Sequence, residues 1–142
     1  MIRTLRLSIL ALSVGLFFSC DSMKDMGGSS NLLSMLTQNT WVLNSLGGKV
    51  LSSATSDLPF LNFGENGVLS GFSGCNNFNG SFDLEGTKVS LDPGAMTRKA
   101  CEGSMEDQFL NVLKSVDNLS FEGSKLNLLN GASVLASFLP KN

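Results

Sequence analysis

Short runs of alternating apolar and polar residues, separated by glycine-containing turns, constrain the fold of this chain more than any other feature. The sharpest turn signal is Asn66-Gly67, because both residues accept the positive φ angles that tight hairpins demand. Glu85-Gly86, Gly123 and Asn130-Gly131 separate further runs in the same way. The pattern predicts antiparallel strands over residues 41–46, 60–63, 68–72, 81–84, 88–91, 118–122, 125–129 and 133–138.

One segment, over about residues 102–116, has helical spacing instead. Its apolar residues fall on a single helix face: Met105, Phe109, Val112, Leu113 and Val116. A short apolar helix is also expected over 31–36. Residues 31–142, roughly 110 in number, suit one domain. We therefore expect an α+β fold, a mostly antiparallel β-sheet that is curled or barrel-like, with one packing α-helix.

The first twenty residues have the layout of a signal peptide. Arg3 and Arg6 precede an apolar run over 7–18, which is shorter than the roughly 20 residues that a membrane-spanning helix needs. Residues 16–20, ending in Ser19-Cys20, resemble the lipobox of bacterial lipoproteins, in which the cysteine receives diacylglycerol. We expect residues 1–19 to be removed, Cys20 to be lipidated and residues 20–30 to form a flexible tether. An ordinary secretory signal or a buried N-terminal helix is the alternative.

Charge places further limits on the partners of the mature chain. Ten Lys and Arg less the two in the leader leave eight basic residues against twelve Asp and Glu. The longest basic run is Arg98-Lys99, so the electrostatic footprint of a nucleic-acid-binding protein is missing. The expected partner is a membrane of the cell envelope, reached through the N-terminal lipid. The sequence does not say whether this is the inner membrane, the outer membrane or the cell surface.

The chain contains no histidine and no tyrosine, which excludes Ser-His-Asp triads, Cys-His pairs and histidine metal sites. Paired carboxylates for glycoside chemistry remain, as Asp83 with Glu85 or Glu102 with Glu106. Acids flank every turn and helix here, so we interpret these four as solvated surface residues. We expect no catalytic residue, no metal site and no cofactor.

Two motifs resemble the META domain family, also called HslJ-like. They are Gly74-Cys75-Asn76 with Gly80 in the segment 71–82, and Thr97-Arg98-Lys99-Ala100-Cys101 before the helix. Trp41-Val42-Leu43 and residues 60–63 extend the resemblance over about 38–138. Phe82 departs from a tyrosine that is frequent in the family. The resemblance implies a compact, often exported β-rich domain without established chemistry.

The first motif has a structural and a functional interpretation. Gly71, Gly74 and Gly80 can adopt backbone shapes closed to other residues, and Asn76 can hydrogen-bond turn backbone, which predicts a shaped loop over 74–80 between two strands. The alternative is a polar ligand site lined by Asn76 and Asn77. Trp41, which begins an apolar strand, is expected to be a core anchor.

Cys75 and Cys101 form an even pair once Cys20 carries lipid, and export would expose them to an oxidising compartment. A disulfide is the favoured interpretation. Two buried reduced thiols, or a redox or metal-binding role, are the alternatives.

Three function classes follow. The leading one is a non-catalytic envelope lipoprotein that supports stress tolerance by binding or shielding another envelope component. A carrier of a lipid or small apolar ligand is second, because a curled sheet closed by a helix can hold a cavity. An accessory or inhibitory module for a protein partner, using exposed loops over 47–57 and 92–97, is third.

Overall fold

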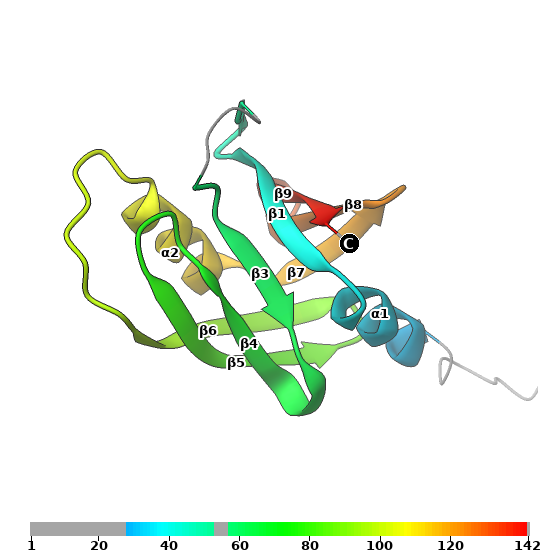
Figure 1. The fold of residues 1–142 in the computed structure, drawn as a ribbon. Helices are drawn as coiled ribbons and strands as arrows, with labels where there is room; N and C mark the ends of the chain where they lie inside the picture. The colour runs from blue at the N-terminus through cyan, green and yellow to red at the C-terminus, as the bar shows by residue number, and fades with distance from the viewer. Residues whose placement is uncertain (1–27, 53–56, 142) are drawn as a thin grey trace, which may run out of the picture.

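The computed structural model describes residues 28–52 and 57–141 (Figure 1). The elements are α1 (Gly28–Thr37), β1 (Thr40–Leu46), β2 (Lys49–Val50), β3 (Phe60–Phe63), the 3-10 turn η1 (Glu65–Gly67), β4 (Val68–Phe72), β5 (Asn77–Glu85), β6 (Lys88–Met96), α2 (Glu106–Ser115), β7 (Asn118–Glu122), β8 (Lys125–Asn130) and β9 (Ser133–Lys141). All eight predicted strands are present. The signal peptide, Cys20 and most of the expected tether lie outside the described residues.

The strands form one antiparallel sheet that closes into a ring. The neighbour order is β2-β1-β3-β4-β5-β6-β7-β8-β9, and β1 also pairs with β9. Trp41 lies opposite Pro140 in that closing pair, and Leu46 lies opposite Ala136. Eight strands therefore encircle the core, with the short β2 attached outside the ring. The prediction of a curled, mostly antiparallel sheet is confirmed.

The ring is joined least extensively between β6 and β7. Lys88 and Asn118 are their one register pair. The Val89 amide donates to the Asp117 carbonyl at 3.0 Å, and the Leu119 amide donates to the Thr87 carbonyl at 2.9 Å. Beyond this point no strand of the described chain pairs with β6 on that side, and helix α2 contacts β6.

Side-chain alternation turns one face of most strands inward, whereas β8 and β9 each have three successive buried residues. Trp41 is 2% exposed, and its indole Nε1 donates to the Leu36 carbonyl of α1 at 2.9 Å. Its ring meets Phe121 of β7 edge-on, with 5.6 Å between centroids. The interpretation of Trp41 as a core anchor is confirmed, and the same contacts seat α1 against the ring.

Helix α2 packs against β6 and turns its apolar face toward the interior of the ring. Phe109 is fully buried, with its ring centroid 6.5 Å from that of Phe78 in β5 and 6.3 Å from that of Phe138 in β9. Three strands separate β5 from β9 in either direction around the ring, so Phe109 lies between opposite walls. The expected packing helix is confirmed. Of its predicted face, Met105 is half-buried and the other four residues are buried.

The helix boundaries differ from the predicted ones. Helix α2 begins at Glu106 rather than near residue 102, since Gly103 has a φ of +69° that a helix does not accept. Helix α1 begins at Gly28, so the last three residues of the expected tether are helical. Neither helix in the described part of the chain is long and apolar enough to cross a membrane.

The β5–β6 hairpin is longer than predicted, which corrects two loop predictions. Gly80 lies in β5 rather than in a loop, and residues 92–96 belong to β6 rather than to an exposed loop. Ser81 pairs with Asp92, and Asn79 with Gly94. Glycine, asparagine and proline are poor strand formers, but the long hairpin pairing overrides their local preference.

The predicted hairpin turn between β3 and β4 is confirmed. Asn66 and Gly67 both have positive φ, at 57° and 75°. The turns at Gly86, Gly123 and Gly131 also have positive φ.

Candidate functional site

Asn76 is the centre of a buried polar cluster between the β4–β5 loop and the segment that leads into α2. The residue is 3% exposed. Its amide nitrogen donates to the Lys99 carbonyl at 3.1 Å and to Glu106 Oε1 at 3.0 Å. Its amide oxygen accepts from the Lys99 backbone amide at 2.7 Å and from the Thr97 hydroxyl at 2.9 Å. One side chain thus fastens three chain segments together.

Glu106, the first residue of α2, is the acidic member of the cluster. It also accepts from the Asn76 backbone amide at 3.0 Å and from the hydroxyl of Ser73, which is fully buried. Burial by itself would raise the pKa of Glu106, but the hydrogen bonds from Ser73 and Asn76 outweigh it and hold that pKa below its ordinary value. The carboxylate therefore stays ionised at neutral pH.

A disulfide between Cys75 and Cys101 closes the same region covalently. Their Cα atoms are 5.9 Å apart, within the range that a bridge requires. Cys75 is buried and Cys101 is exposed, so the bridge ties the surface segment over 97–105 to the interior. The disulfide prediction is confirmed.

Two different physical constraints require glycine at the motif positions. Gly74 has a φ of +97°, so backbone freedom explains it, as predicted. Gly71 and Gly80 do not have positive φ. A Cβ at Gly71 would overlap the Phe60 carbonyl, and one at Gly80 would overlap the Asp92 carbonyl. Close approach of neighbouring strands, rather than an unusual backbone shape, excludes a side chain there.

The structure does not bring Asn76 and Asn77 to one ligand site. Asn77 is exposed at the start of β5, whereas Asn76 is enclosed. A groove of about 560 Å³ runs beside the cluster, lined by residues 94–100 with Asn76 and Glu106. Both polar ends of the Asn76 side chain are already bonded to protein, so the residue acts first as a structural fastener.

The two candidate acid pairs have different outcomes. Asp83 and Glu85 are exposed on β5 and Glu102 is exposed before α2, as expected of solvated residues. Glu106 is half-buried and accepts hydrogen bonds from Ser73 and Asn76, so its interpretation as an ordinary solvated surface residue was wrong. Sequence reasoning missed it because residue 106 lies beside the apolar helix face and gives no signal that a loop thirty residues earlier supplies donors. In residues 28–52 and 57–141, no three Asp, Glu, Cys or His side chains gather as a metal site.

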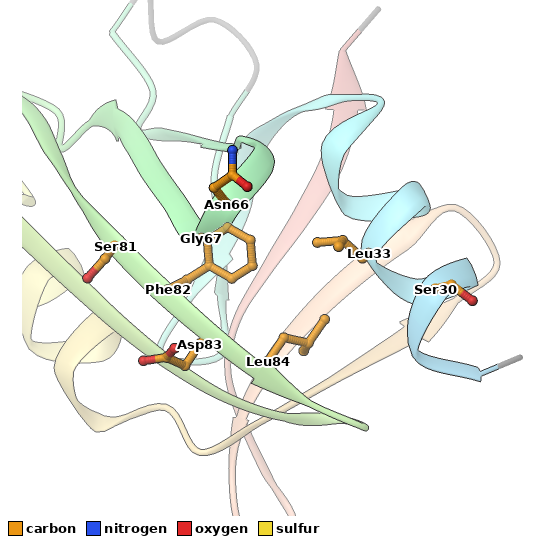
Figure 2. Close-up of a pocket in the computed structure, with 8 residues that line it drawn as sticks. All are labelled: Ser30, Leu33, Asn66, Gly67, Ser81, Phe82, Asp83 and Leu84. Atoms are coloured by element: carbon orange, nitrogen blue, oxygen red, sulfur yellow. The ribbon is translucent and has the colours of Figure 1, made fainter. Parts of the chain in front are cut away.

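A second hollow, of about 660 Å³, lies between α1 and β5. Figure 2 shows Leu33 of α1 turned toward Phe82 and Leu84 of β5, while the Asp83 carboxylate turns away. Asn66 and Gly67 of the β3–β4 turn complete its wall. Its wall therefore combines these apolar side chains with polar residues, among them Ser30 and Ser81.

The closed antiparallel ring, with one helix packed against it and a cysteine bridge beside Asn76, defines a small α+β domain class. Within that class the chain belongs to the META domain family, whose model matches residues 34–142. The resemblance of the two motifs to the META domain is thereby confirmed.

Two structures solved by NMR are similar to this fold. One has 28% sequence identity and a TM-score of 0.60, covering 75% of this chain and 93% of its own. The other, from Burkholderia xenovorans, has 24% identity and a TM-score of 0.62, covering 79% of this chain and 88% of its own. No curated protein matched the chain in sequence.

Proposed function

We propose that this protein is a non-catalytic lipoprotein of the cell envelope, held to a membrane by lipid on Cys20, that supports stress tolerance by binding another envelope component. We expect the partner to bind the outer surface of the ring, because Phe109 lies between opposite walls inside it. Since that side chain and its neighbours fill the interior, a large partner has only the outer surface to bind.

The polar cluster supports a non-catalytic role. A general acid or base needs free access to a substrate proton. Glu106 instead accepts hydrogen bonds from Ser73 and Asn76, and its lowered pKa keeps it from acting as a proton donor near neutral pH. The groove beside it is thus lined in part by groups that already hold the fold together, among them Asn76, Thr97 and Glu106.

The anchor is tested by metabolic labelling with a fatty-acid analogue. Wild type should incorporate label and fractionate with membranes, whereas Cys20→Ser should lose the label and accumulate as a soluble or uncleaved chain. Ser22→Ala is the matched control and should label normally. Equal labelling of wild type and Cys20→Ser would refute the anchor.

The envelope role is tested in a strain that lacks the protein. The strain should be more sensitive to envelope stress, and wild type should restore tolerance while Cys20→Ser should not. Restoration by the unlipidated variant would argue against a role at the membrane surface.

A second candidate, a carrier of a small apolar ligand, is favoured by the hollow between α1 and β5. Its volume lies within the range of small-ligand pockets, and Leu33, Phe82 and Leu84 would contact the ligand. Native mass spectrometry of gently purified protein should then show added mass that Leu33→Asp abolishes. A bare protein mass for wild type would exclude this candidate.

A further inference from the structure

The outer face of the ring carries two parallel rows of side chains that run across neighbouring strands. We define the apolar row as Leu139 of β9, Val42 of β1, Phe60 of β3 and Phe72 of β4, each directly opposite the next in the strand register. We define the polar row as Thr40, Asn62, Ser70 and Asn79, which are paired in the same way on β1, β3, β4 and β5.

The apolar row does not belong to the core. None of its residues packs in the buried cluster, Leu139 is 44% exposed, and the other three are partly exposed. Phe60 and Phe72 stack side by side, with 6.1 Å between centroids and 28° between planes. At about 4.8 Å between strands, the four residues make a strip roughly 14 Å long with two aromatic rings in it.

The polar row lies two residues along each strand, about 7 Å from the apolar row. The Thr40 hydroxyl donates to Asn62 Oδ1 at 2.7 Å, which fixes that amide. Asn79 is exposed and Ser70 is partly exposed, so both can reach a bound molecule. Neither row contains a charged residue, although Lys141 flanks Thr40 at one end.

We infer that these two rows bind a neutral glycan chain of the envelope through stacking of sugar rings on Phe60 and Phe72 and hydrogen bonds to the polar row. A sugar ring has an apolar face of C–H groups and an edge of hydroxyls. Its C–H groups carry partial positive charge, which suits the negative face of an aromatic ring. Uncharged amides and hydroxyls beside the strip match the sugar hydroxyls.

A bilayer fits the surface less well. Insertion into lipid gains free energy from a broad apolar surface, and this strip is only one residue wide on each strand. The adjacent polar row would also have to lose its water on insertion. The inference rests on the proposed function, because it identifies the class of envelope component that is bound.

The test uses the full lipoprotein in detergent and two neutral β-1,4-linked probes, chitohexaose and cellohexaose, which differ in their acetamido groups. Isothermal titration calorimetry should show binding of wild type to at least one probe. Phe60→Leu and Phe72→Leu should each weaken it about tenfold or more, since leucine keeps the apolar area and removes the aromatic face. Val134→Ala, at an exposed apolar position elsewhere on β9, is the matched control and should bind normally.

Asn79→Ala tests the polar row at an exposed position that leaves the core intact, and it should weaken binding severalfold. No binding of either probe to wild type would overturn the inference, as would full binding by the two leucine variants. Fatty-acid labelling and the probe masses after incubation are measured on the same protein. If the protein is lipid-labelled but the probes stay intact and unbound, the glycan inference alone is wrong. If the probe masses show cleavage, the non-catalytic role is wrong.

Discussion

Replacing Glu106 by Gln tests whether the carboxylate fastens α2 to the β4–β5 loop. Glu106 accepts hydrogen bonds from three donors, which are the Ser73 hydroxyl, the Asn76 backbone amide and the Asn76 side chain. Gln keeps one neutral acceptor oxygen but turns an amide NH2 group toward these donors, so at least one of the hydrogen bonds to the charged carboxylate is lost. Because each such loss costs about 1–3 kcal/mol, we expect a decrease of about 2–4 kcal/mol in the free energy of unfolding at pH 7.

The effect should depend on pH with a defined sign. The folded-state pKa of Glu106 lies below its ordinary value of 4.5, so its contribution to stability is present above that pH. The contribution is lost as the pH falls through the lowered pKa, where the carboxylate takes up a proton. The difference between wild type and Glu106→Gln should therefore be largest near neutrality and shrink below pH 4.5.

Urea unfolding followed by circular dichroism, from pH 7 down to pH 3, measures both quantities. Asp107→Asn is the matched control, because Asp107 is the exposed neighbour in the same helical turn and should change stability by no more than about 0.5 kcal/mol. A loss below about 0.5 kcal/mol for Glu106→Gln, or a loss that stays constant through the acid range, would refute the fastening role.

Three further stability predictions follow from the core, the disulfide and the strand contacts, each measured by denaturant unfolding. Phe109→Ala should cost about 3–5 kcal/mol and Leu113→Ala about 2–5, and losses below about 1 kcal/mol for both would contradict the packing of α2. Replacing Cys75 and Cys101 together by serine should cost about 3.5 kcal/mol, because the bridge closes a loop of about 27 residues, and unchanged stability would mean that the bridge does not form. Gly80→Ala should cost about 1–3 kcal/mol, since its Cβ would overlap the β6 backbone, and full stability would show that the hairpin can separate there.

The strands could be predicted because their signals are local. Residues 60–63 and 68–72 alternate between buried and partly exposed side chains, and the Asn66-Gly67 turn between them has the positive φ angles that its residue types favour. The Cys75–Cys101 bridge followed from counting cysteines in an exported chain. The strand prediction depends only on adjacent residues, and the disulfide prediction depends only on the number of cysteines.

The polar cluster could not be predicted because its parts come from distant segments. From the sequence alone, Glu106 is interpreted as a solvated acid near the start of a helix. Its role appears only when the loop that contains Asn76 packs against it. The sequence placed Gly80 in a loop, because the need for glycine there arises only from the close approach of the Asp92 carbonyl on the neighbouring strand. The two outer rows likewise appear only when the register of four strands is known. The role of Glu106, the need for Gly80 and the two outer rows all depend on tertiary contacts, which no local sequence pattern encodes.

Because β1 pairs with β9, the ring can close only after nearly the whole described chain has been synthesised or exported. Thr40 lies opposite Lys141, so β1, which pairs with β3 on one side, receives its neighbour on the other side only from the final segment of the described chain. A chain emerging from a ribosome or a membrane pore with its N-terminus first cannot close the ring until about a hundred further residues have followed β1, and contacts of such long range form slowly. Until then β1 and β8 each present an unpaired edge, to which another chain can add a strand. Truncation within β9 should accordingly yield aggregates rather than a smaller folded domain.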